Sequence, residues 1–224
     1  MEPMGGSGPQ DDLPWADLRR EMVETQLVGR GIRDPRVLEA MGCLRREEFV
    51  PTRQRSAAYE DRALPVGPEQ TISQPYIVAY MTEKLDLCPG HRVLEVGGGT
   101  GYQAALLSLL GTQVVSIESD PCLVQAAQER LARLDIKGVQ FHRGDGTIGL
   151  ARLAPFDRII VTAAAPKVPP ALVEQLVDHG RLIIPVGSVS QQMLVCVTRR
   201  GNRTIEHTLL ACRFVRLVGN QGWN

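Results

Sequence analysis

The sequence predicts an α/β protein with a doubly wound, mostly parallel, seven-stranded sheet of the Rossmann-like class. Strands and helices alternate from residue 92 to residue 186, which is typical of parallel strands joined by helices on both faces of a sheet. A glycine cluster lies between the first of these strands and its helix, as in nucleotide-binding crevices. Acidic residues then follow consecutive strands, at the edge where such sheets bind ligands.

A single domain with a short leader accounts for the 224 residues, since a chain of this length can bury one good-sized core. Residues 1–13 are polar and contain several Gly and Pro, so we expect a disordered leader there. Residues 14–224 are expected to form one domain. Within it, residues 14–90 supply N-terminal helices and a lid loop around Ser73, and residues 91–224 supply the Rossmann-like core.

The N-terminal part predicts three helices and one long loop. Residues 17–28 carry apolar side chains at helical spacing. A second helix begins with Asp34 as N-cap, followed by proline, and stops at Gly42. Residues 59–75 contain prolines, glycines and hydroxyl residues, which favour an irregular loop of functional importance. Residues 76–87 are expected to be helical. The first two helices are too short to form a domain alone and should pack beside or over the ligand crevice.

The core is expected to alternate strands and helices and to end in an antiparallel strand pair. Five strands are expected at 92–96, 114–118, 139–142, 157–162 and 181–186, and three helices at 102–110, 120–134 and 169–177. The closing pair is expected at residues 193–198 and about 209–218, with Gly201 and Asn202 in the turn between them.

The glycine cluster has the spacing G-x-G-x-G, formed by Gly97, Gly99 and Gly101. A dinucleotide-binding G-x-G-x-x-G motif would need glycine at the position of Tyr102. The spacing therefore favours S-adenosylmethionine over a nicotinamide cofactor. A purely structural turn between strand and helix is the alternative.

Three carboxylates support a nucleoside ligand. Glu118 ends the second strand and can accept both ribose hydroxyls, although it could also be a helix N-terminal charge. Asp145, within Gly144-Asp145-Gly146, can reach an adenine amine or simply form an Asx-turn. Glu95 lies inside an apolar strand, where a carboxylate is costly unless it has a partner such as the ammonium of a methionine moiety. Together with the glycines, this set predicts a class I S-adenosylmethionine-dependent methyltransferase fold.

Composition argues against several other classes. The 25 Lys and Arg balance 25 Asp and Glu, so no electrostatic attraction to nucleic acid or to an anionic membrane is expected. Three arginine pairs are predicted to lie on solvated surfaces: Arg19-Arg20, Arg45-Arg46 and Arg199-Arg200. The five cysteines form no C-x-x-C motif, and no metal site is expected. Neither a signal peptide nor a membrane span is predicted, which favours a cytoplasmic enzyme, and we expect a monomer.

Several segments resemble the protein-L-isoaspartate O-methyltransferase family. The most specific is the loop Thr71-Ile72-Ser73-Gln74-Pro75. The resemblance extends from about Leu18 to Trp223 and includes residues 22–23, 26–27, 30–32, 64–67, 70–79, 144–146, 154–164, 213–215 and 217–219. It departs from the family pattern at Gly98 and Arg45, where the family commonly has a hydroxyl residue and a proline. These departures concern affinity rather than the class of reaction.

This resemblance implies an enzyme that methylates the free α-carboxylate of L-isoaspartyl residues in damaged proteins or peptides. The ester then closes to a succinimide, which hydrolyses partly back to aspartate. The family's catalytic serine corresponds to Ser73, which would hold the substrate carboxylate, and residues 71–73 would act as a lid over the cofactor. With Glu95 added from the residue argument, the predicted S-adenosylmethionine contacts are Gln70, Thr71, Ile72, Glu95, Gly97, Gly99, Gly101, Glu118, Asp145 and Gly146.

Three other functions are weighed against isoaspartyl repair. A peptide-tailoring enzyme of the same family would methylate aspartate in a maturing peptide, but such relatives tend to have additional C-terminal sequence. A non-catalytic binding module would keep the cofactor site, although the intact Ser73 loop argues against it. A nicotinamide oxidoreductase is disfavoured by Tyr102 in place of the third glycine.

Overall fold

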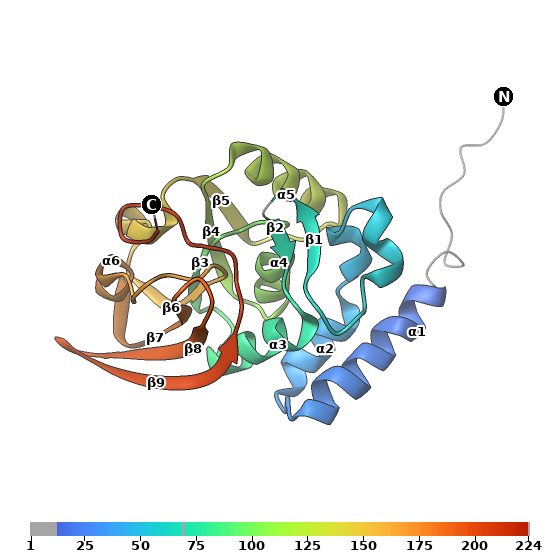
Figure 1. Ribbon diagram of the computed structural model, residues 1–224, viewed down its shortest axis with the longest axis horizontal. Coiled ribbons are helices and arrows are strands. Elements are labelled where there is room, and N and C mark those ends of the chain that lie inside the picture. Colours follow the sequence, from blue (N-terminus) through green and yellow to red (C-terminus); the bar gives the residue numbers. More distant parts are fainter. Residues whose placement is uncertain (1–12, 69, 224) are drawn as a thin grey trace.

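The computed structural model describes residues 13–68 and 70–223, and its centre is a seven-stranded sheet (Figure 1). The strand order is β5-β4-β3-β6-β7-β8-β9; the first five are parallel, and β8 and β9 are antiparallel to their neighbours. The strands are β3 (Arg92–Val96), β4 (Gln113–Glu118), β5 (Val139–Arg143), β6 (Phe156–Val161), β7 (Leu176–Gly187), β8 (Gln192–Arg200) and β9 (Arg203–Cys212). The predicted doubly wound, seven-stranded sheet is confirmed.

The helices lie on both faces of this sheet (Figure 1). They are α1 (Leu13–Glu21), α2 (Pro35–Cys43), α3 (Pro75–Lys84), α4 (Tyr102–Leu109), α5 (Pro121–Arg133) and α6 (Pro170–Glu174). A π-helix and a 3-10 turn continue α1 as Met22–Leu27 and Val28–Arg30, and further 3-10 turns are Arg46–Phe49, Thr52–Ala57, Gly146–Ile148 and Ala151–Leu153. Asp34 caps α2 as predicted, because its side chain accepts the N–H of Arg36.

Side chains of β3 alternate between two hydrophobic clusters, as the two-residue period of a strand requires. Val93 belongs to the cluster on the side of the N-terminal helices, whereas Leu94 and Val96 belong to the opposite cluster, which also contains Leu172 of α6. Glu95 shares the face of Val93. This places a carboxyl group on the face of the sheet that the N-terminal helices cover.

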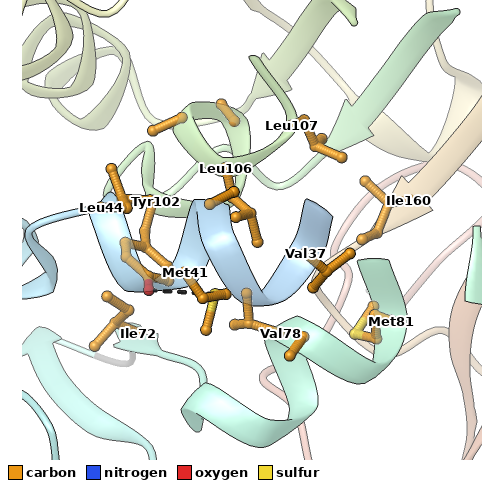
Figure 2. Packing of buried hydrophobic residues seen from close by; sticks show 14 of the residues in the cluster. Val37, Met41, Leu44, Ile72, Val78, Met81, Tyr102, Leu106, Leu107 and Ile160 are labelled. Atoms are coloured by element: carbon orange, nitrogen blue, oxygen red, sulfur yellow. Dashed lines mark hydrogen bonds between the residues drawn. The ribbon is translucent and has the colours of Figure 1, made fainter. Parts of the chain in front are cut away.

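Helix α2 packs between α3 and α4 on that face (Figure 2). Met41 of α2 lies against Tyr102 of α4, whose hydroxyl donates to the Met41 sulfur at 3.6 Å. Val78 of α3 and Leu106 of α4 complete this contact. The prediction that the N-terminal helices pack beside the crevice is confirmed, and the same hydrophobic cluster contains residues from both sides of position 90.

Strand pairing corrects two predictions, those for residues 59–75 and for the helix at 169–177. Residues 59–75 are not wholly irregular, because β1 (Leu64–Gly67) and β2 (Gln70–Ile72) form a small antiparallel sheet. Such short strands leave no recognisable periodicity. The helix predicted at 169–177 ends at Glu174, since β7 begins at Leu176 and pairs there with Phe156.

The last strand begins earlier than predicted, at Arg203 rather than near residue 209. Its register is fixed by β8 through the turn at Gly201 and Asn202, not by the apolar run that suggested residues 209–218. The strand is polar at first because β9 is a solvent-exposed edge of the sheet.

Apart from Leu13, the predicted leader lies outside the described residues. No helix in the described parts of the chain is both long and apolar enough to cross a membrane.

Candidate active site

The glycine turn follows β3 at the point where the chain order reverses, since β4 lies on one side of β3 and β6 on the other. Gly97, Gly99 and Gly101 all have positive φ angles, of 92°, 50° and 84°. These are conformations that glycine adopts without strain. A Cβ atom on Gly97 would also lie 2.5 Å from the hydroxyl of Thr162. Gly101 caps α4. The backbone conformation of the turn therefore favours glycine at each of these three positions.

A cavity of about 740 Å³ opens at this turn. One wall is the carboxyl end of β3 and β4, a second is the β1–β2 hairpin with Ser73, and a third is the segment after β9. Of the predicted site residues, the cavity is lined by Gln70, Thr71, Ile72, Ser73, Glu95, Gly97, Gly99, Glu118 and Gly146. Gly101 and Asp145 are not among its lining residues.

Glu118 organises the glycine turn from the end of β4. Its Oε2 accepts the N–H of Gly99 at 3.0 Å, and its Oε1 accepts the N–H groups of Ser119 and Asp120 at 2.7 and 3.1 Å. The side chain is buried and borders the cavity. A carboxylate held in this way is preorganised to accept further hydrogen bonds from a ligand in the cavity.

Glu95 is completely buried, yet it lines the same cavity. Its Oε2 accepts the hydroxyl of Ser116, and its Oε1 has no hydrogen-bond partner in the described structure. Burial raises the pKa of Glu95 to about 8. The hydrogen bond from Ser116 lowers this pKa, whereas the negative charge of Glu118 raises it. An acceptor atom that is buried and unpaired is costly, so the site is suited to a cationic or hydrogen-bond-donating ligand.

Gly98 differs from its neighbouring glycines because its backbone does not need positive φ. The limit is space: a Cβ atom there would lie 2.5 Å from the Ser116 hydroxyl that holds Glu95. This departure from the family pattern therefore accommodates Ser116.

We expect Gly98→Ala to displace Ser116 and leave Glu95 without any partner, destabilising the fold by about 1–3 kcal/mol. Replacing Ser116 by alanine as well should recover part of that loss, because the clash disappears. Thermal unfolding of the wild type, both single variants and the double variant measures this coupling. Strictly additive effects of the two changes would contradict it.

Asp145 is used by the fold itself. Its Oδ1 accepts the N–H and hydroxyl of Thr147 at 2.8 and 2.6 Å, and its Oδ2 accepts the N–H of Asn220 at 2.8 Å. Burial opposes ionisation, but these hydrogen bonds outweigh it and hold the pKa of Asp145 below its ordinary value. Asp145 thus forms the Asx-type turn that the sequence analysis gave as the alternative to an adenine contact. It also connects the C-terminal segment to the end of β5.

Ser73 directly follows β2 and lies half-buried at the cavity wall. Ile72 beside it is buried, and Ile72 pairs with Leu64 in the small sheet. The carbonyl oxygen of Ser73 accepts Nη2 of Arg46 at 2.7 Å. In this conformation the segment predicted as a lid is therefore anchored to the domain.

Sequence reasoning missed two groups of residues. Arg46 was predicted to lie on a solvated surface, as was Arg19, but their exposed fractions are 0% and 7%. The second group lies on the third wall of the cavity and comprises Val189, Gln192, Phe214, Arg216 and Val218. Of these, only Phe214 and Val218 had drawn attention, through the family resemblance.

Comparison with known proteins agrees with this geometry. The chain matches the family model of protein-L-isoaspartate(D-aspartate) O-methyltransferase (PCMT) over residues 18–222. It is 50% identical over 210 residues to a protein-L-isoaspartate O-methyltransferase of Methanoregula boonei, covering 94% of this chain and 97% of that relative. Identity to the protein of the same name from Geobacter metallireducens is 48% over 206 residues, covering 92% and 95% of the two chains.

Solved structures show the same likeness. One protein-L-isoaspartate O-methyltransferase has a TM-score of 0.84 and 33% identity, covering 91% of this chain and 67% of that chain. A second structure is described as such an enzyme from Plasmodium falciparum in complex with S-adenosyl-L-homocysteine. Its TM-score is 0.78 at 27% identity, and the likeness covers 90% of this chain and 99% of that chain.

Proposed function

Because the chain belongs to the protein-L-isoaspartate(D-aspartate) O-methyltransferase family, we infer that its cavity brings S-adenosylmethionine to the carboxylate of an isoaspartyl residue. The enzyme is an S-adenosylmethionine-dependent methyltransferase that acts in repair of isoaspartyl residues. S-adenosylmethionine as methyl donor agrees with the prediction from the G-x-G-x-G spacing. A nicotinamide oxidoreductase is not supported.

The cavity fits the cofactor in chemical terms. We propose that Glu118 accepts the ribose hydroxyls and that the unpaired Oε1 of Glu95 faces the methionine ammonium, directly or through water. Gly97 and Gly99 line the cavity without side chains, so a ligand can approach the backbone closely there. Oδ2 of Asp145, which accepts only one hydrogen bond, is proposed to take the adenine amine, with Gly146 at the cavity wall.

Ser73 is proposed to donate its hydroxyl to the substrate carboxylate. When bound, S-adenosylmethionine supplies an activated methyl group. A carboxylate, with a reference pKa near ~4, is already a nucleophile at neutral pH, so no strong general base is needed. The residues of the cavity then contribute by orienting the carboxylate and by excluding water, and orientation of this kind can lower a barrier by several kcal/mol. The observation that carries this proposal is Ser73 on one wall of the cavity, with Glu95 and Glu118 on another.

The test compares matched peptides that contain L-isoaspartate or L-aspartate, incubated with labelled S-adenosylmethionine. We expect base-labile label on the isoaspartyl peptide alone, because a methyl ester hydrolyses in base. Label on neither peptide, or equal label on both, would contradict the proposed reaction and its substrate.

The raised pKa of Glu95 predicts a pH-dependent stability. Its pKa of about 8 lies above the ordinary value of 4.5, so the neutral form stabilises the fold. That contribution is complete below pH 4.5 and is lost as the pH rises through 8. Without cofactor, we expect the melting temperature of the wild type to fall relative to Glu95→Gln between pH 6 and about pH 9.

Binding should show the opposite trend. An ammonium group favours the ionised form of Glu95, so affinity for S-adenosylhomocysteine is expected to rise with pH in the wild type and to be weaker and flatter in Glu95→Gln. Titration calorimetry at several pH values measures the affinity of both proteins. Parallel pH profiles for the two proteins would contradict the assignment of Glu95.

We further propose that one chain, acting as a monomer in the cytoplasm, forms the whole site as a single methyltransferase domain. The glycine turn, Ser73 and both Glu95 and Glu118 border one cavity, which supports a single-domain site. The five cysteines are unpaired, as is usual in a reducing compartment. Light scattering during size-exclusion chromatography should give the mass of one chain, 24.6 kDa. A multiple of that mass would contradict the monomer.

A further inference from the structure

Arg46 is an unusual residue for its position because its side chain is completely buried without a carboxylate partner. It has the largest side chain among the fully buried residues, and no salt bridge involves it in the described structure. Its Nε donates to the carbonyl of Ala58 and its Nη2 donates to the carbonyl of Ser73, both at 2.7 Å. Nη1 has no partner among the described residues.

A buried cation of this kind is costly to the fold. Burial lowers the pKa of Arg46, although a guanidinium keeps its charge at physiological pH. Two carbonyl groups could be satisfied by a neutral donor, so their presence alone does not require a positive charge. The charge is therefore best explained by a function outside the hydrogen bonds that Arg46 makes.

The position of Arg46 beside the cavity indicates what this function is. Its guanidinium carbon lies 5.0 Å from the centre of the Tyr102 ring, and Tyr102 lines the cavity. Ser73, whose carbonyl Arg46 holds, lines the same cavity. The positive charge thus lies against the Tyr102 ring and the Ser73 carbonyl, both of which border the cavity, in a buried setting where a low dielectric strengthens electrostatic attraction.

Ser73 is also anchored on its other side. The side-chain amide of Gln74 donates to both the carbonyl and the Oδ1 of Asp61, at 2.9 and 2.8 Å. Asp61 in turn pairs with Arg30 at 2.9 Å. This second anchor is exposed and lies at the start of α3. Of the two anchors that flank Ser73, only the one made by Arg46 is buried.

We propose that Arg46 is a positioning residue for methyl transfer, which holds Ser73 at the cavity wall and, by its buried positive charge, favours binding of the substrate carboxylate. The inference rests on the proposed role of Ser73 and adds the residue that makes that role effective. Arg46 contacts neither substrate nor cofactor in this account. Its effect should therefore appear in the use of the peptide and not in the binding of the cofactor.

The test uses Arg46→Gln, which removes the charge, and Arg46→Lys, which keeps it but cannot span both carbonyls. We expect KM for the isoaspartyl peptide to rise at least tenfold in Arg46→Gln. The rise should be smaller in Arg46→Lys, while the Kd for S-adenosylhomocysteine stays within about twofold of the wild type in both. Thermal unfolding of each variant accompanies the kinetics.

Arg158 offers a matched control at the other end of α3. It also donates to main-chain carbonyls, those of Leu85 at 2.6 Å and Asp86 at 3.0 Å, and it lies outside the cavity lining. We expect Arg158→Gln to lower the melting temperature without raising KM for the peptide.

The outcomes separate this inference from the proposed function. If the wild type fails to methylate the isoaspartyl peptide, the proposed function is wrong. If the wild type is active and both Arg46 variants keep its KM, the inference is wrong. It is also wrong if Arg46→Gln and Arg46→Lys lose cofactor binding together with activity, because Arg46 then serves only the fold.

Discussion

Replacing Ser73 with alanine is expected to lower kcat/KM for an isoaspartyl peptide about tenfold to a hundredfold. A hydrogen bond to a charged group contributes about 1.5–3 kcal/mol, and each ~1.4 kcal/mol corresponds to a factor of ten in rate. The alanine variant keeps the carbonyl that Arg46 binds, so the loop should keep its place. Initial rates at varied peptide concentration, with S-adenosylmethionine saturating, measure the effect.

Two controls test whether the loss of rate comes from the Ser73 hydroxyl itself. Ser56→Ala removes the same hydroxyl from an exposed 3-10 turn outside the cavity lining and should leave the rate unchanged. The Kd for S-adenosylhomocysteine should be the same in Ser73→Ala as in the wild type. Undiminished turnover in Ser73→Ala would remove Ser73 from the mechanism, whereas a matching loss of cofactor affinity would assign it to cofactor binding.

The sequence was sufficient wherever a local pattern determines the structure. β3 was predicted with its observed bounds, because an apolar run that ends at a glycine leaves few alternatives. Asp34 was predicted as a cap because its hydrogen bond reaches only two residues along the chain. By contrast, β9 and the β1–β2 hairpin depend on pairing with another strand, which a window of neighbouring residues does not contain.

The same distinction applies to the active site. The glycine turn and Glu118 lie at the ends of two consecutive predicted strands, and Glu118 contacts Gly99 as expected for a nucleotide-binding crevice. Arg46 gave no signal, because its burial depends on carbonyl groups 12 and 27 residues away, at Ala58 and Ser73. Asp145 depends on Asn220, 75 residues later in the chain. The burial of Arg46 was therefore mispredicted, because its partners lie outside any local sequence pattern.

Glu118→Gln is expected to weaken S-adenosylhomocysteine binding about a hundredfold or more. Loss of two charge-assisted hydrogen bonds to a ribose costs ~3 kcal/mol or more, and ~1.4 kcal/mol is a factor of ten in Kd. The amide adds a second penalty. In the wild type both oxygens accept main-chain N–H groups, from Gly99 on one side and from Ser119 and Asp120 on the other. An amide has one oxygen, so its NH₂ group must face N–H donors on one of these sides.

This double role of Glu118 can be resolved by measuring stability and affinity together. The clash of donors should lower the melting temperature of Glu118→Gln without any ligand. Glu118→Ala, which places no donor against these N–H groups, should bind as weakly but unfold at a higher temperature than Glu118→Gln. Glu129→Gln is the matched control, because Glu129 is an exposed residue of α5 that accepts a hydrogen bond from Gln125 of the same helix. Wild-type affinity in Glu118→Gln would show that the carboxylate only organises the glycine turn. Weak binding in both Glu118 variants, with normal binding in the control, would place the ribose at the end of β4.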